Sequence, residues 1–141
     1  MKHCFVALAS TLHRYANAYI EQALKEKGLK GIVPSHGDIL VNLYQRKSIS
    51  MQELAALIKR TKATTTVLVD KLEKLGFVTR SRSEQDGRST LVSLTEKGAS
   101  YENTFNEIGD SLNLRVMKYL SEDEAELLES LMKKTIDGFT D

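Results

Sequence analysis

The apolar residues between positions 5 and 24 recur at alternating gaps of three and four, which is the spacing of one stripe along an α-helix. Gly28 and Gly31 follow, and glycine is common just beyond a helix C-terminus. The residues of the stripe are Phe5, Leu8, Leu12, Tyr15 and Tyr19. The pattern predicts a long first helix with one apolar face.

Three shorter helices are predicted between positions 34 and 76. Ser35 follows a proline and is able to cap a helix that runs to about position 47. Ser50 stands three residues before a glutamate, the spacing of a capping box. Thr61 caps a further helix, which Gly76 ends.

The period then changes from helical to alternating. Residues 77–82 and 89–94 are rich in Val, Thr, Phe and Leu, and a polar turn with an Asp-Gly pair joins them, as in a β-hairpin. Thr95 begins a long helix with an apolar stripe, and Ser121 begins a last helix with a second capping box. The chain is therefore expected to be mostly α with a small β-hairpin.

Short helices joined by a tight turn and followed by a hairpin are typical of a winged helix-turn-helix, in which the hairpin is the wing. We therefore predict a winged helix-turn-helix over residues 34–98, within a single structural domain overall. The helices of residues 1–33 and 99–141 carry more apolar surface than this central part can cover. They are predicted to be dimerisation helices that associate with a second copy of the chain.

The composition is that of an ordinary globular domain, with 141 residues, 41% apolar and 28% charged. Cys4 is the single cysteine and cannot form an internal disulfide, and the N-terminus lacks the pattern of a signal peptide. No stretch approaches the ~18 uninterrupted apolar residues of a membrane span. We expect a cytoplasmic protein with no membrane segment and no cofactor.

The formal net charge is only +1, but the charges are unevenly distributed. Residues 59–90 contain eight basic and four acidic side chains, whereas residues 121–141 contain seven acidic and two basic ones. A local positive field of this kind can attract phosphate even when the whole chain is nearly neutral.

The predicted helix that begins at Thr61 has an outward face of short side chains. Its core face carries Thr65, so Ala63 and Val67 lie opposite, with Thr64 and Thr66 on the flanks. Methyl and hydroxyl groups of this size suit base edges in a DNA major groove, and Lys62 and Lys71 are placed to reach phosphates. The alternative is a threonine-rich helix start that only caps and packs.

The predicted hairpin carries three arginines. Arg80 and Arg82 alternate onto one face of its first strand, and Arg88 follows the turn, with few acidic residues nearby in the sequence. Asp86 could orient Arg88 through a charge-assisted hydrogen bond, and Arg88 could then enter a narrow minor groove. The alternative is an exposed ion pair of little energetic value.

These segments together resemble the MarR family of bacterial transcription regulators. Asp86-x-Arg88 followed by Leu94-Thr95-x-x-Gly98 resembles the family's wing signature, and residues 52–55 and 61–78 resemble its second and third central helices. The resemblance implies a homodimer whose terminal helices interleave and whose winged domains bind double-stranded DNA at a palindromic operator. A small-molecule effector or oxidation would release a repressor of this type.

By this resemblance Thr64, Thr66 and Val67 take major-groove positions and Arg88 the minor-groove position. Val67 departs from the pattern, since many relatives carry Arg there, so methyl contact would replace guanine recognition. Ser35 and His36, at a helix N-terminus, would contact the sugar-phosphate backbone. The full predicted set is Ser35, His36, Lys62, Ala63, Thr64, Thr66, Val67, Lys71, Arg80, Arg82, Asp86 and Arg88.

The sequence offers only weak effector candidates. Cys4 near the first helix loosely resembles the thiol of peroxide-sensing relatives, although a lone cysteine is more often a packing residue. Tyr15, Tyr19 and Tyr44 could line an aromatic pocket, although such residues more often belong to the core. The three histidines lack a tight ligand spacing, so no metal site is predicted, and a metal-responsive regulator remains an alternative.

Two other classes of function compete with DNA binding. A winged helix could serve as a protein-interaction module whose basic hairpin binds an acidic partner. An enzyme is not expected, because the sequence contains no glycine-rich phosphate loop, no nucleophile elbow and no paired carboxylates in a defined cleft.

Overall fold

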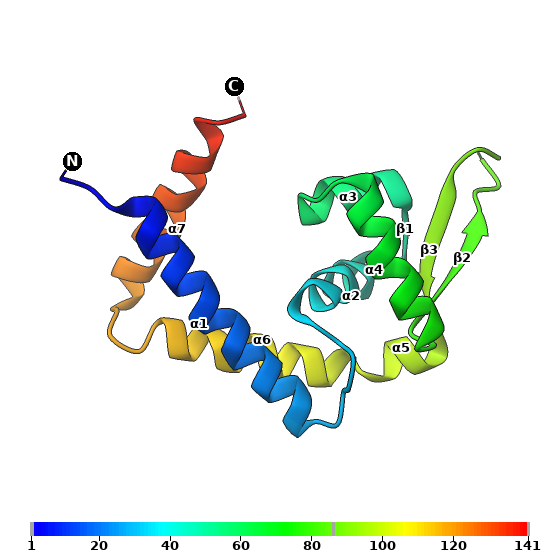
Figure 1. Cartoon of the computed structure of the whole chain (residues 1–141), viewed down its shortest axis with the longest axis horizontal. Helices are drawn as coiled ribbons and strands as arrows, with labels where there is room; N and C mark the ends of the chain where they lie inside the picture. The colour runs from blue at the N-terminus through cyan, green and yellow to red at the C-terminus, as the bar shows by residue number, and fades with distance from the viewer. Residues whose placement is uncertain (1, 86, 141) are drawn as a thin grey trace. The chain divides into compact units, whose positions relative to one another are not determined.

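The computed structural model describes residues 2–85 and 87–140, which form two compact units, Met1–Ile108 and Gly109–Asp141. Figure 1 shows the elements. They are α1 (Phe5–Glu26), α2 (Pro34–Arg46), β1 (Ser48–Ser50), α3 (Met51–Ile58), α4 (Lys62–Lys74), β2 (Val78–Arg82), β3 (Thr90–Leu94), α5 (Glu96–Ser100), α6 (Glu102–Val116) and α7 (Glu122–Asp137). The fold is mostly α with a small antiparallel sheet, as predicted.

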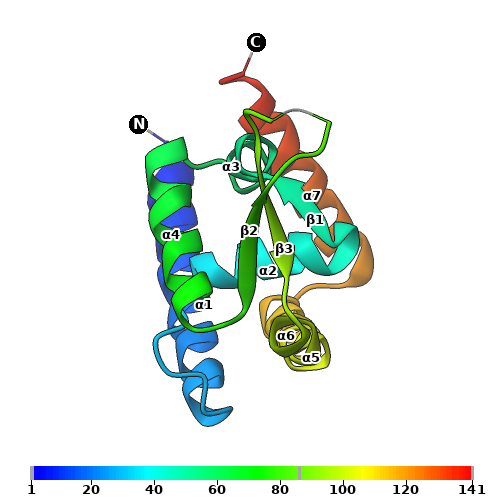
Figure 2. The same ribbon diagram turned by 90° about the vertical axis from the view of Figure 1, so that its right-hand side faces the viewer.

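The sheet has three strands in the order β1-β3-β2, and Figure 2 shows β3 between its neighbours. The hairpin of β2 and β3 was predicted, whereas β1 was not. In the central strand, Val92 pairs with Ile49 of β1 on one side and with Arg80 of β2 on the other. Because β1 has only three residues, its alternation is too short to stand out in the sequence.

The core of the first unit lies among α2, α3, α4 and the sheet. Its largest fully buried side chains include Ile39, Leu40, Leu43, Leu54, Leu72 and Val92. Thr65 is also fully buried, and its hydroxyl donates to the carbonyl of Thr61 at 2.8 Å, so no buried polar group is left without a partner there. This packing holds α4 with Thr65 inward, as its sequence predicted.

The predicted helix starts are confirmed at four of five places. The hydroxyls of Ser50, Thr61, Thr95 and Ser121 each accept a backbone N–H three residues on. The prediction for Ser35 is wrong, since α2 begins at Pro34 with Val33 as its N-cap, two residues before the predicted cap. The side chain of His36 serves as the cap instead, because its Nδ1 accepts the N–H of Val33 at 3.0 Å.

The long helix predicted from Thr95 is divided into α5 and α6 at Tyr101. The start of α5 packs closely on the end of α4. The Thr95 hydroxyl donates to the carbonyl of Gly76 at 2.5 Å and accepts the N–H of Gly98 at 3.0 Å. A Cβ at Gly98 would overlap the carbonyl oxygen of Phe77, so this contact requires glycine. The base of the wing is thereby tied to the end of α4.

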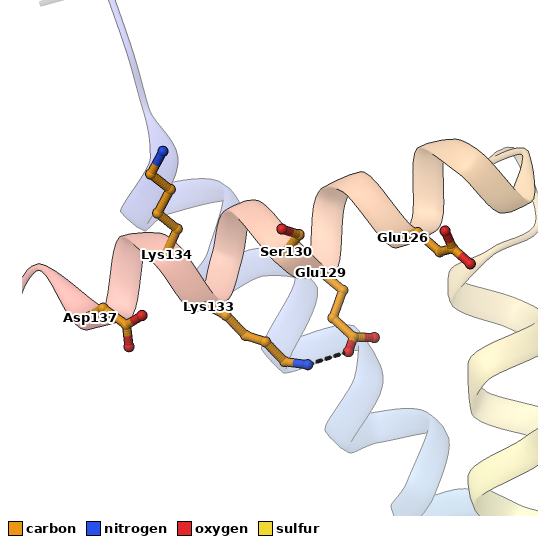
Figure 3. Close-up of a pocket in the computed structure, with 6 residues that line it drawn as sticks. All are labelled: Glu126, Glu129, Ser130, Lys133, Lys134 and Asp137. Atoms are coloured by element: carbon orange, nitrogen blue, oxygen red, sulfur yellow. Dashed lines mark hydrogen bonds and ion pairs between the residues drawn. The ribbon is translucent and has the colours of Figure 1, made fainter.

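Two helices carry apolar stripes that their own unit leaves in solvent. On α1 the exposed residues are Phe5, Val6, Leu8, Leu12 and Tyr15, and on α7 they are Leu127, Leu128, Leu131, Met132 and Ile136. Figure 3 shows the polar residues of α7, including the ion pair in which Lys133 approaches Glu129 to 2.6 Å. Both helices are thus amphipathic. Among the helices of residues 2–85 and 87–140, none has the length and apolar character needed to cross a membrane.

Candidate nucleic-acid interface

The outward face of α4 presents small side chains near the helix N-terminus. Thr61 caps the helix, and its hydroxyl also donates to the hydroxyl of Thr64 at 3.1 Å. Ala63 and Thr64 are exposed, and Val67 exposes 67% of its surface. Thr66 is half-buried, and its hydroxyl donates to the carbonyl of Lys62 at 2.9 Å. The threonine hydroxyls keep lone pairs that can accept further hydrogen bonds.

Basic side chains flank this face. Lys62 and Lys71 are both exposed on α4. Arg82 and Arg88 are exposed on the wing, which comprises β2, β3 and the residues between them. Asp86, the predicted partner of Arg88, lies outside the described residues.

Arg80 differs from what the sequence suggested. Its Nη2 lies 2.7 Å from Oδ1 of Asp70 and 2.9 Å from Oε1 of Glu73, both on α4. Few acidic residues lie near the wing arginines in the sequence, but the fold supplies Arg80 with two acidic partners. The partners were missed because they precede Arg80 by seven and ten positions and belong to a different element.

A polar cavity of about 240 Å³ separates the wing from the N-termini of α3 and α4. Its lining includes predicted DNA-binding residues and others that the sequence did not predict, notably Gln52 and Thr90. The capping serine before α3 could have pointed to Gln52, because side chains in the first turn lie beside free backbone N–H groups. The lining residues are Ser50, Met51, Gln52, Lys62, Thr66, Arg80, Arg88, Ser89 and Thr90.

The two residues predicted at the start of α2 occupy different environments. Ser35 is half-buried, and its hydroxyl accepts a hydrogen bond from Nη2 of Arg60 at 3.4 Å. The guanidinium of Arg60 therefore lies beside the N-terminus of α2. His36 is only 5% exposed. Burial, together with the charge of Lys71, lowers the pKa of His36, in keeping with an unprotonated Nδ1 that accepts the N–H of Val33. His36 therefore has a structural role as a helix cap.

The comparisons with known proteins agree with this geometry. The sequence profile of the MarR family matches residues 32–90. The HTH-type transcriptional regulator YkoM of Bacillus subtilis is 30% identical over 133 residues, covering 92% of this chain and 86% of YkoM. The chain belongs to the MarR family.

Two further relatives cover the chain to a similar extent. The HTH-type transcriptional regulator PrsX of Escherichia coli is 31% identical over 130 residues, covering 89% of this chain and 78% of PrsX. A MarR transcriptional regulator from Methanosarcina mazei superposes with a TM-score of 0.82 at 30% identity, covering 96% of this chain and 97% of that one. The predicted family is thus confirmed, and the protein is a winged helix-turn-helix transcriptional regulator.

One MarR structure was determined with its target. A mutant MarR from E. coli, complexed with operator DNA, superposes with a TM-score of 0.82 at 25% identity, covering 92% of this chain and 91% of that one.

The effector candidates of this MarR protein come from different parts of the chain, and Tyr19 is half-buried on α1. Cys4 is exposed just before α1, and Tyr15 is exposed on α1. Tyr44 instead donates its hydroxyl to the carbonyl of Gly98 at 2.9 Å, beside a cavity of about 430 Å³. Burial raises the pKa of Tyr44 to about 12, so the hydroxyl stays protonated and keeps this bond. Within residues 2–85 and 87–140, no group of three His, Cys, Asp or Glu side chains is placed to hold a metal ion.

Proposed function

We propose that the protein is a homodimeric repressor that binds a palindromic DNA operator through α4 and the wing. The observation that carries this proposal is the exposed, small-residue face of α4 next to exposed wing arginines, with a polar cavity between them. A helix with such a face fits a major groove, whose base edges it can reach without steric hindrance. The similar fold of the E. coli MarR that was solved in complex with operator DNA supports DNA as the partner.

Base recognition is assigned to Ala63, Thr64, Thr66 and Val67. Because Val67 is an apolar side chain left mostly in water, contact with a thymine methyl group would remove apolar surface from solvent on both sides. The threonine hydroxyls can accept from base amino groups. We therefore propose that this face prefers sites with thymine at the central major-groove position.

Phosphate contacts are assigned to the residues around that face. Gln52 and Thr90 line the cavity beside the N-terminus of α3, where free N–H groups favour an anion. Lys62, Lys71 and Arg82 are exposed and can reach the backbone on either side. The further backbone candidates are Ser35 and Arg60.

Arg88 is assigned to the minor groove. It is exposed beyond β2, and it lines the same cavity as Lys62. A narrow minor groove over A·T base pairs concentrates negative potential and attracts a guanidinium. Asp86 is proposed to orient Arg88, as its spacing in the sequence suggested.

A second copy of the chain is proposed to cover the apolar stripes of α1 and α7. These stripes face solvent in their own units, and stripes of this size usually mark an association surface. A two-fold dimer also matches a palindromic operator, because each subunit reads one half-site. The polar side chains of Figure 3 would remain in solvent.

Release by a small ligand or by oxidation is proposed as the control of DNA binding, with no catalytic activity. The support is the MarR family itself and the exposure of Cys4. Tyr44 lines the cavity of about 430 Å³, so it is the tyrosine whose position best suits a ligand.

Binding to DNA can be tested by selecting sites from random-sequence duplexes and measuring affinity by fluorescence anisotropy. If the dimer neutralises about eight phosphates, log K falls with log salt at a slope near −7. Sedimentation of the same samples reports the oligomeric state. Failure to enrich any duplex, or affinity without salt dependence, would contradict the proposal and favour a protein-interaction module.

A further inference from the structure

Arg80 occupies the middle of β2, where it pairs with Val92 in the centre of the sheet. Its side chain extends from the wing to α4, and the same nitrogen, Nη2, contacts both carboxylates. The side chain of Arg80 is 29% exposed, compared with 46% for Asp70 and 39% for Glu73. These two ion pairs join the wing directly to α4.

The two carboxylates lie on the side of α4 where negative charge is least favourable for DNA binding. Asp70 follows Val67 by three positions and therefore lies on the same outward face, and Glu73 follows Asp70 by three. A carboxylate beside a phosphate backbone is repelled unless a cation neutralises it. The Arg80 hydrogen bond lowers the pKa of Glu73, so this carboxylate stays ionised and paired.

We propose that Arg80 is a positioning residue, which fixes the wing against α4 and neutralises Asp70 and Glu73, rather than a direct DNA contact. This inference rests on the proposed function. Its physical basis is that one guanidinium nitrogen is committed to two helix carboxylates, so the orientation of the strand relative to the helix is set before DNA arrives. The major-groove and minor-groove contacts are thereby held at one spacing.

Positioning and direct contact have opposite consequences for specificity. A residue that binds phosphate adds equally to the affinity for every duplex, and its loss lowers the salt slope by about one per contact. A residue that positions two reading elements adds mainly to the affinity for the correct site. The ratio of operator affinity to non-specific affinity therefore distinguishes the two roles, and a role in folding alone would leave this ratio unchanged.

The test uses the full chain, a selected duplex and a scrambled duplex of equal length and composition. The variants are Arg80→Ala, the double variant Asp70→Asn with Glu73→Gln, and the combination of all three changes. Arg82→Ala is the matched control, because Arg82 lies two residues along the same strand, is exposed, and forms no ion pair with residues 2–85 or 87–140. Thermal unfolding of every variant separates loss of fold from loss of binding.

We expect Arg80→Ala to lower the ratio about tenfold with little change in salt slope, a typical coupling for residues in one network. The carboxylate double variant should also lower the ratio, while its affinity for scrambled DNA stays the same or rises. In the triple variant, the ratio should be little lower than in Arg80→Ala or in the carboxylate double variant. Arg82→Ala should instead weaken binding to both duplexes alike.

The inference is overturned if Arg80→Ala behaves like Arg82→Ala, or if the carboxylate double variant strengthens binding to both duplexes equally. Either result would make Arg80 a phosphate contact. If the unmodified protein selects no duplex at all, the proposed function fails, and this outcome is distinguishable from failure of the inference because it appears before any variant is made.

Discussion

Gly98→Ala is expected to destabilise the protein strongly, although it adds only one methyl group. The new Cβ would overlap the carbonyl oxygen of Phe77 and lie 3.2 Å from Cδ2 of Leu94. The overlapping atom belongs to the backbone, so relief requires movement of the segment that leads into the wing. Such movement also strains two hydrogen bonds, from Thr95 N–H to Phe77 and from the Tyr44 hydroxyl to Gly98.

The size of the effect can be worked from these contacts. Overfilling a packed site costs about 1–3 kcal/mol. Each weakened hydrogen bond costs about 1 kcal/mol. Alanine returns about 1 kcal/mol through its better helix propensity within α5. The free energy of unfolding should therefore fall by about 3 kcal/mol.

The assay is urea unfolding followed by circular dichroism, at one protomer concentration because association contributes to stability. Gly109→Ala is the matched control, since it is the same substitution inside α6, where a Cβ meets no described atom within 4 Å. It should raise the free energy of unfolding by up to ~1 kcal/mol. The reasoning is refuted if the free energy of unfolding of Gly98→Ala lies within about 0.5 kcal/mol of the value for the unmodified protein, or if Gly98→Ala and Gly109→Ala lose stability equally.

Four further outcomes can be measured. Arg88→Ala should weaken operator binding in anisotropy by at least ~1 kcal/mol while sedimentation shows an unchanged oligomer; equal affinity would remove the wing from the interface. Val67→Ala should reduce the preference for thymine in a panel of base-substituted duplexes by about 1 kcal/mol, and an unchanged preference would place Val67 away from the bases. Thr61→Ala should cost about 1 kcal/mol in urea unfolding through loss of the α4 cap, so a neutral result would contradict that role. The pKa of His36 is lowered in the folded state, so near the unfolded-state pKa of about 6.5 the unfolded chain binds more protons, and stability falls as the pH drops through that value. His36→Asn should therefore make the melting temperature less dependent on pH between about pH 7.5 and about pH 5.5. An unaltered pH dependence would count against this explanation.

The helices could be predicted from the sequence because their signals are local. The caps at Ser50, Thr61 and Ser121 act on backbone groups three residues away, and the apolar spacing of α4 decides which face turns inward. The inward position of Thr65 and the exposure of Val67 follow directly. Much of the reading face of the proposed site was therefore predictable from one segment.

Two features were misassigned or missed, one at the start of a helix and one in a strand whose partner lies far along the chain. Ser35 has the chemistry of a cap, but the path of the chain before α2 places Val33 there and brings the His36 ring to its N–H. The strand β1 exists because Ile49 can pair with Val92, more than forty positions later. A local sequence pattern cannot predict such a pairing, because the pairing stabilises a strand only when the other strand lies beside it.

The sequence by itself determined most of the helices, the hairpin with its arginines, the inward and outward faces of α4, and the family. Only the tertiary structure decided which charges meet, and therefore that Arg80 contacts Asp70 and Glu73 while Arg82 stays exposed. The physical reason is that helix periodicity and capping depend on neighbours within four residues, whereas an ion pair depends on distances of a few ångströms between elements that packing brings together.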